Sequence, residues 1–117
     1  MSALKNEKQE LRNHCLQIAE YLADPYQDQY NDDGCLNEEG EKPTAYDYLQ
    51  DVYNIEYYVD SNKEYLGARL LVAFGGPNIY VDTRYKKVEG YWWGDYAEVS
   101  FDDELGLDEA CSELFNC

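Results

Sequence analysis

Basic residues are scarce in this chain of 117 amino acids. Nine Lys and Arg stand against 25 Asp and Glu, which gives a formal net charge of −16. Direct binding to nucleic acid or to an anionic membrane surface requires clusters of Lys and Arg. The deficit therefore argues against both of these partners. It also creates self-repulsion that works against compaction, so the fold has to offset an electrostatic cost.

Histidine is rarer still, because His14 is the only one. Nucleophilic triads and most catalytic zinc sites need a His placed beside a Ser, a Cys or a second His. The neighbouring Cys15 does not meet this need, since adjacent residues of a helix point about 100° apart. The sequence therefore predicts no catalytic residues, and we expect the protein not to be an enzyme.

Paired cysteines are also missing, because the four cysteines form no CxxC motif. A structural zinc site usually shows paired ligands two to four residues apart. We therefore expect reduced thiols, with Cys15 and Cys111 packed as small apolar side chains, and no metal or other cofactor.

Long apolar runs are absent as well. No stretch approaches the roughly 18 residues that cross a bilayer, and the start of the chain lacks the apolar run of a signal peptide. We expect a protein that stays in the cytoplasm and does not contact membranes.

What the chain does contain is enough aromatic and aliphatic residues, 13 Tyr among them, to build one folded domain over residues 1–117. Helical spacing predicts a first helix over about 4–23, and an acidic loop follows over about 24–43. The α+β core over about 44–117 opens with Thr44, a good N-cap with Asp47 three residues on. The remaining elements are a short helix to about Tyr53, strands at Ile55–Asp60, Tyr65–Phe74, Ile79–Thr83 and Lys87–Trp93, and a final helix over about 107–115. Residues 96–101 are either a fifth strand or an irregular bridge.

Short connections between successive strands favour an antiparallel meander. The fold class expected is α+β: a sheet of about four or five strands covered by about three helices.

Acidic residues are concentrated in two segments. Residues 24–64 carry twelve acids and two bases, and residues 95–117 carry eight acids and no base. Carboxylates at i, i+4 on a helix or i, i+2 on a strand are separated by about 6–7 Å, close to the phosphate spacing of a DNA strand. An acidic face of this kind can occupy the basic groove of a nucleic-acid-binding protein. The residues predicted to form it are Asp47, Asp51, Glu56, Asp60, Asp102, Asp103, Asp108 and Glu109.

Aromatic side chains among these acids suit a protein contact, because they offer rigid apolar area. The candidate anchors are Tyr48, Tyr57, Trp92 and Trp93. Because consecutive strand residues face opposite sides, one Trp is expected in the core and the other exposed. The two Trp with nearby carboxylates also leave open a small glycan-binding or glycan-processing protein.

Three stretches carry a resemblance: Tyr46–Leu49, LLVAFGGPNIYVDT at 70–83 and VEGYWWGD at 88–95. They are similar to a family of small proteins carried by mobile elements and phages of gut Firmicutes. The resemblance implies a bacterial host cell but assigns no activity and no site residues. In its acidity alone, the chain resembles the DNA-mimicking antirestriction and anti-CRISPR inhibitors that such elements carry.

Together these observations predict a stoichiometric inhibitor or decoy of a host nucleic-acid-binding enzyme, such as a nuclease or an effector complex. A protein-interaction module that does not mimic nucleic acid is the first alternative. The small glycan-binding or glycan-processing protein is the second.

Overall fold

The computed structural model describes residues 2–25 and 44–117, with side chains from residue 8 onward in the first range. The predicted acidic loop therefore lies almost entirely outside the described residues. The helices are α1 (Ser2–Ala23), α2 (Ala45–Gln50) and α3 (Leu107–Phe115). The strands are β1 (Asn54–Val59), β2 (Tyr65–Ala73), β3 (Asn78–Asp82), β4 (Lys87–Trp92) and β5 (Asp95–Ser100).

The five strands form one antiparallel sheet in the order β1-β2-β3-β4-β5. This confirms the predicted α+β meander, and it shows that residues 95–100 are a regular strand. Two register shifts, between Tyr58 and Val59 and between Leu71 and Ala73, interrupt the pairing of β2 with its neighbours. The strands are short and their connections are tight, as the turn residues of the sequence indicated.

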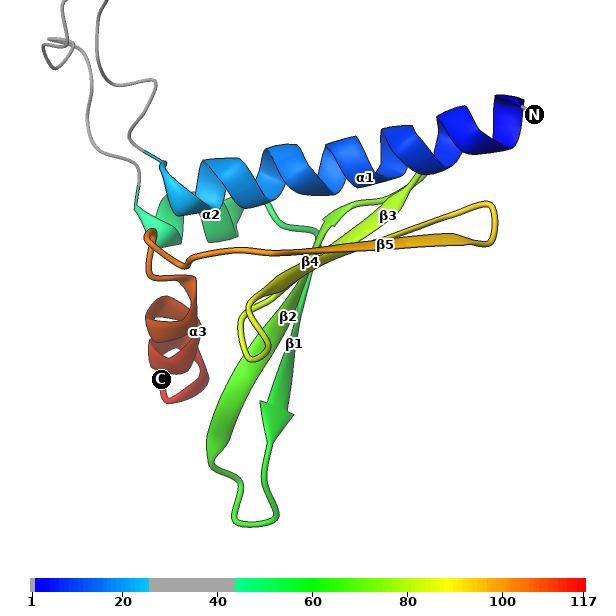
Figure 1. Cartoon of the computed structure of the whole chain (residues 1–117). Helices are drawn as coiled ribbons and strands as arrows, with labels where there is room; N and C mark the ends of the chain where they lie inside the picture. Colours follow the sequence, from blue (N-terminus) through cyan, green and yellow to red (C-terminus); the bar gives the residue numbers. More distant parts are fainter. Residues whose placement is uncertain (1, 26–43) are drawn as a thin grey trace, which may run out of the picture.

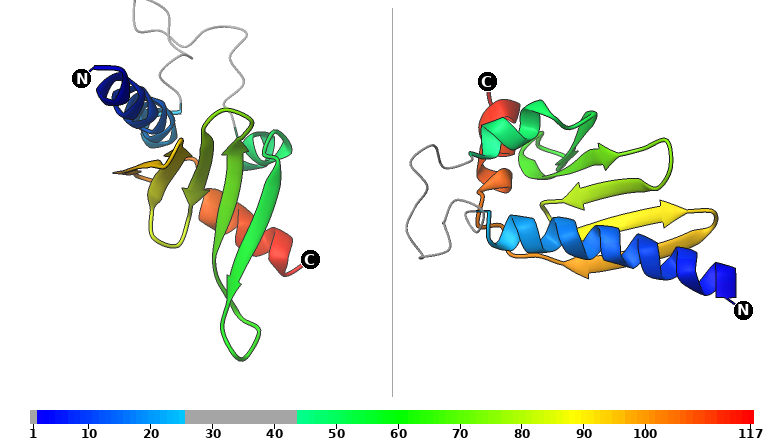
Figure 2. Two further views of the ribbon diagram at one scale, coloured as in Figure 1. Left: turned by 90° about the vertical axis from the view of Figure 1, so that its right-hand side faces the viewer. Right: turned by 90° about the horizontal axis from the view of Figure 1, so that it is seen from above.

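The helices lie on one face of the sheet, called here the covered face (Figures 1 and 2). α1 packs along β4 and β5, whereas α3 packs against β2 and contacts α2. Gly90 permits the close approach of α1, because a Cβ there would lie 2.7 Å from Cys15 Sγ and 2.8 Å from Leu11 Cδ1. The described residues contain no helix long and apolar enough to cross a membrane.

The core is built from the covered face and the apolar stripe of the helices. Leu11, Cys15 and Leu22 of α1 are fully buried, as are Leu70 and Val81 of the sheet. Register places Leu70 opposite Val81 and Val81 opposite Val88, so these side chains share one face.

The helix ends follow the sequence signals closely. Thr44 and Asp47 form the predicted capping box at the start of α2. α2 ends three residues earlier than expected, at Gln50, and α1 begins two residues earlier, at Ser2. The fourth strand ends at Trp92, one residue before the predicted boundary, because Trp93 has a positive φ of 53° and lies in the turn.

Candidate functional site

α2 and α3 lie beside each other at one end of the molecule (Figure 1), and the segments that contain them are rich in Asp and Glu. Residues 44–53 and 101–117, called here the acidic end, contain eight Asp and Glu and no Lys or Arg. The Tyr46 hydroxyl of α2 donates a hydrogen bond to Glu113 of α3, which ties the two helices together. Tyr46 and Glu113 are 67 positions apart in the sequence, yet their segments form one surface.

Four of the eight predicted acids are exposed on the acidic end. Asp47 and Asp51 belong to α2 and its C-cap, Asp102 precedes α3, and Glu109 lies in its first turn. One carboxylate oxygen of Asp47 takes part in the capping box, because Oδ2 accepts a hydrogen bond from the Thr44 backbone N–H at 3.2 Å. Asp51, Asp102 and Glu109 present their carboxylates to solvent.

Asp103 turns inward and caps α3. Its Oδ1 accepts the backbone N–H groups of Gly106 at 3.1 Å and Leu107 at 2.8 Å. Its Oδ2 accepts the Asp108 N–H at 2.9 Å, and Lys86 Nζ lies 3.7 Å away. This carboxylate replaces the cap that Gly106 at the N-cap position lacks. Its role in the structure is to hold the helix start.

Asp108 also turns inward, toward the sheet. Its Oδ1 accepts hydrogen bonds from the Tyr65 hydroxyl at 2.9 Å and from Thr83 Oγ1 at 2.8 Å. Thr83 Oγ1 in turn accepts the Ala68 N–H at 2.8 Å. Hydrogen bonds to ionised groups are the stronger ones, so this chain fixes α3 against β2.

Glu56 and Asp60 do not join the acidic end. Glu56 points away from the helices and lies 3.9 Å from Arg69. Asp60 closes the β1–β2 turn, where its Oδ1 accepts the N–H groups of Asn62 at 2.8 Å and Glu64 at 2.9 Å. The carboxylates therefore do not continue as a row along β1.

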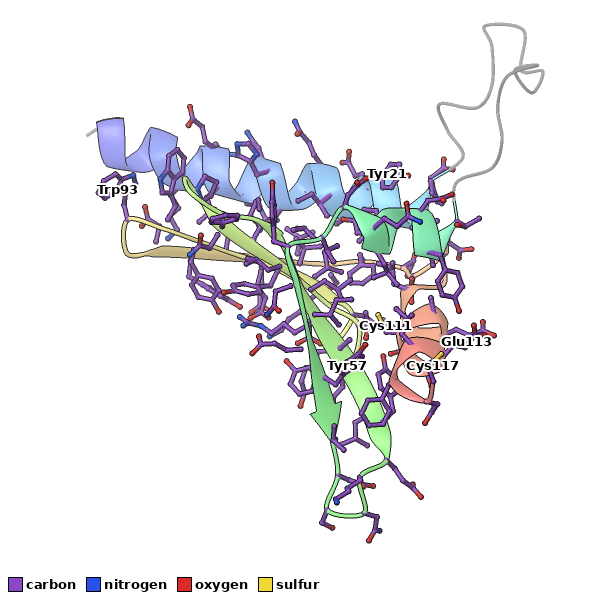
Figure 3. The ribbon with its side chains drawn as sticks, turned by 180° about the vertical axis from the view of Figure 1, so that it is seen from behind. Tyr21, Tyr57, Trp93, Cys111, Glu113 and Cys117 are labelled. Carbon is purple, nitrogen blue, oxygen red and sulfur yellow. The ribbon has the colours of Figure 1, made fainter. Side chains whose placement is uncertain are left out.

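The predicted anchors Tyr48 and Tyr57 lie on the covered side of the molecule. Tyr48 stacks on Tyr21 with ring centroids 6.1 Å apart, and burial raises the pKa of its phenol to about 12. Tyr57 packs against Phe115 of α3, with ring centroids 5.2 Å apart. Figure 3 shows Tyr57 beside α3. Both rings support the helices, although 36% of Tyr57 stays exposed.

The two tryptophans differ as expected. Trp92 packs against the core, whereas 78% of Trp93 is exposed. Strand alternation is the wrong reason, however, since Trp93 is the first residue of the β4–β5 turn. Figure 3 shows Trp93 at the tip of that hairpin, beside the N-terminal end of α1.

The opposite face of the sheet, called here the open face, has no helix of the described part packed on it and carries a polar network that sequence reasoning missed. Glu89 is its centre, with only 7% exposed. The hydroxyls of Tyr96 and Tyr91 donate to Glu89 Oε2 at 3.1 and 3.3 Å. Arg69 Nε lies 3.7 Å and Lys87 Nζ 3.8 Å from the same carboxylate. Burial raises the pKa of both phenols, and the Glu89 charge adds to the effect.

A second carboxylate of the open face, Asp82, is 1% exposed. The Tyr58 hydroxyl donates to its Oδ2 at 2.6 Å, and the Tyr85 N–H donates to its Oδ1 at 2.9 Å. Burial raises the pKa of Tyr58, and this hydrogen bond raises it further. The sequence signal for this network is the alternation of side chains along β3. Tyr80 and Asp82 fall between the apolar Ile79 and Val81 and therefore face the opposite side of the sheet.

The predicted burial of Cys15 and Cys111 is confirmed. Cys15 and Cys111 are buried and unpaired, and Cys117 is exposed and unpaired. Burial raises the pKa of Cys15 to about 11 and that of Cys111 to about 12. Cys35 lies outside the described residues, and among the described residues no group of His, Cys, Asp and Glu could hold a metal ion.

No protein-family model, curated protein or solved structure matches this chain.

Proposed function

We propose that the protein is an acidic inhibitor that binds a nucleic-acid-binding protein, with its acidic end occupying the basic groove meant for nucleic acid. The observation that supports this most is the charge of the acidic end, eight acids without one Lys or Arg across two helices in contact. Such a patch attracts a basic groove over long range and repels other acidic surfaces.

The acids divide into two groups that suit this role. Asp103 and Asp108 hold α3 in place through hydrogen bonds to backbone and side chains. Asp51, Asp102 and Glu109 face solvent, where a partner's Lys and Arg can reach them. A fixed scaffold that carries exposed charges loses little conformational entropy on binding.

Competition is the decisive test. The protein is immobilised, a lysate of a gut Firmicute is passed over it at low and high salt, and bound proteins are identified by mass spectrometry. Each captured protein is then challenged with duplex DNA or RNA. We expect nucleic-acid-binding proteins that salt releases steeply and that nucleic acid displaces, because both ligands use the same groove.

A charge-matched pair of variants localises the contact. The first carries Asp51→Asn, Asp102→Asn and Glu109→Gln, and the second carries Glu10→Gln, Glu64→Gln and Glu98→Gln. Each variant removes three negative charges, so the net charge becomes less negative by the same amount in both. Since an exposed ion pair contributes about 0.2–1 kcal/mol, the first variant should bind about tenfold more weakly, and the second about as well as the wild type. Equal effects of both variants, or partners that nucleic acid does not displace, would overturn the proposal.

A second candidate, an interaction module that does not mimic nucleic acid, is favoured by one exposed apolar pair. Tyr53 and Phe74 are 62% and 59% exposed, and their rings meet edge to face at 4.7 Å. A partner bound there would be lost with Phe74→Ser and would respond weakly to salt. The same capture experiment separates the two candidates.

A further inference from the structure

The sheet ends at β5, and no other described strand pairs with its outer edge. Trp92 pairs with Asp95 across a two-residue turn, so this pair is hydrogen-bonded and every second residue after it bonds to β4. The hydrogen bond of 3.0 Å from the Phe101 N–H to the Lys86 carbonyl follows the same alternation. The residues whose backbone N–H and C=O groups point outward, away from β4, are therefore Tyr96, Glu98 and Ser100.

A groove of about 230 Å³ lies beside this edge, between α1 and the end of β5. Most of its lining is apolar, and Leu16 at its wall is 36% exposed. Extended peptides add a strand to a sheet at such places, because the free backbone groups supply hydrogen bonds and the groove takes alternate side chains. The apolar lining residues are Leu16, Ala19, Ala23, Val99 and Phe101.

The groove faces the outer side of α1. On the other flank of this helix, Tyr21 stacks on Tyr48 of α2 with ring centroids 6.1 Å apart. Leu16 and Glu20 lie one turn apart on the flank that faces away from α2, and both line the groove. Figure 2 shows β5 at the edge of the sheet alongside α1. An added strand would therefore continue the sheet next to this flank, with alternate side chains directed into the groove.

The charges around the edge indicate what kind of strand fits. Glu20 and Asp102 are exposed in the lining, and no Lys or Arg of the described part lines the groove. Glu98, in the middle of the outward-pointing residues, has a side chain that is 50% exposed. Two copies of β5 paired in antiparallel register would place Glu98 opposite Glu98, and like charges in that position destabilise the pair. A strand that carries Lys or Arg meets complementary charge instead.

We propose that β5 and the groove bind an extended basic segment of a partner polypeptide, which adds a strand antiparallel to β5, as all strand pairs of this sheet are. Residues opposite Tyr96, Glu98 and Ser100 lie with them on the open face, so a Lys or Arg there reaches Glu98. The residues between them direct apolar side chains into the groove. Glu20 and Asp102 attract the positive segment over a longer range.

The inference goes beyond the proposed function and does not depend on it. The groove borders the acidic end through Asp102. It recognises the backbone of an extended segment, however, and needs no partner that also binds nucleic acid.

The probe is a capped hexapeptide of alternating Lys and Val, titrated into the full chain. In the proposed pairing the lysines lie opposite the outward-pointing residues, so their backbone N–H groups face β5 and those of the valines face away. One matched peptide is methylated at the three lysine backbone nitrogens, and another at the three valine backbone nitrogens. Charge is the same in all three peptides. We expect lysine methylation to weaken binding about 100-fold and valine methylation to change it less than about threefold.

Amide hydrogen exchange, followed by NMR, locates the contact. In the free protein the amides of Tyr96, Glu98 and Ser100 should exchange fast, whereas those of Ala97 and Val99 are protected by their bonds to β4. The hexapeptide should slow exchange of the first set about tenfold or more. The second set should change little.

Two matched pairs of variants check the edge and the groove. Ser100→Pro removes an outward N–H and leaves the bonds to β4, so it should weaken binding about tenfold, whereas Ser100→Ala should not. Leu16→Ser removes apolar wall and should weaken binding about fivefold. Leu66→Ser, at a residue of β2 that is 38% exposed, should leave it unchanged. The methylated peptides are compared on the wild-type chain, so that comparison holds even if Ser100→Pro does not fold.

The proposal is overturned if the two methylated peptides bind equally, or if the valine-methylated peptide is the weaker one. It is also overturned if a peptide with Glu in place of Lys binds as tightly as the parent, or if exchange slows at the acidic end and not at β5. Slow exchange of the outward amides in the free protein, lost on dilution, would assign the edge to a second copy and overturn it as well. None of these results changes the competition expected of nucleic acid for a captured partner.

Discussion

The two faces of the sheet are built from the same strands but are stabilised differently. The covered face presents Leu70, Val81 and Val88 to the helices, and burial of apolar area holds it. The open face presents tyrosines and charges that satisfy one another around Glu89 and Asp82. Most carboxylates of the described residues thus lie at capped helix ends, beside tyrosine or arginine partners, or in open solvent.

High pH should destabilise the protein through ionisable groups on both faces of the sheet. We expect this to be the largest of the effects predicted here on the free energy of unfolding. Unfolded thiols lose protons from about pH 9, whereas folded Cys15 and Cys111 keep theirs to about 11 and 12. The folded state therefore binds more protons in this window, so stability is full below pH 9 and falls as pH rises. The loss at pH 11 should be about 2 kcal/mol for each thiol, with Tyr48 adding to it. Urea unfolding at pH 8, 10 and 11 measures it.

The contribution of the covered face is isolated by a Cys15→Ala, Cys111→Ala variant. Its stability should depend less steeply on pH than that of the wild type, because the two buried thiols with raised pKa values are gone. A free energy of unfolding that stays constant between pH 9 and 11 in the wild type would contradict the burial of these thiols.

Two adjacent leucines compare the faces directly. Leu70 is fully buried on the covered face, and Leu71 is half-buried on the open face. Leu70→Ala should cost about 2–5 kcal/mol, because it removes buried methyl groups and leaves a cavity. Leu71→Ala should cost about 1 kcal/mol. Urea unfolding of both variants provides the measurement, and equal losses would mean that the open face is a second core.

Glu89→Gln examines the polar network itself. The substitution keeps an acceptor for Tyr91 and Tyr96 but removes the charge that Arg69 and Lys87 approach. We expect a loss of about 1–2 kcal/mol in the free energy of unfolding. Glu98→Gln, which removes the exposed ion pair with Lys87, should cost no more than about 0.5 kcal/mol. If Glu89→Gln left the free energy of unfolding unchanged, the charge of Glu89 would not contribute to the stability of the fold.

The sequence predicted the elements well, because each signal was local. The capping box of Thr44 and Asp47, the helical spacing of Leu11 and Cys15, and the tight turns all depend on residues close in the chain. The burial of Cys15 and Cys111 followed from their helical positions.

The candidate site was harder to predict, because charge does not say where a side chain points. Asp103 and Asp108 look like their exposed neighbours in sequence. Asp103 nevertheless turns back to cap α3 and lies 3.7 Å from Lys86, and Asp108 accepts hydrogen bonds from Tyr65 and Thr83 elsewhere in the fold. The burial of Glu89 among charged partners could not be predicted without the pairing of the strands, because Arg69 approaches it from another strand. Tertiary partners, and not composition, separate the structural carboxylates from the free ones.

The smallest effect, a gain, is expected at the tip of the β4–β5 hairpin, where two adjacent tryptophans differ most. Trp93 has a positive φ of 53° and is 78% exposed, whereas Trp92 packs against the core. Trp93→Asn should raise the free energy of unfolding by about 0.5–1 kcal/mol, because Asn tolerates this conformation and little packing is lost. Trp92→Asn should lower it, since a polar amide would replace apolar contacts with the core. Thermal and urea unfolding of both variants measure the difference. If Trp93→Asn instead destabilised the protein, the indole would be a structural element of the fold despite its exposure.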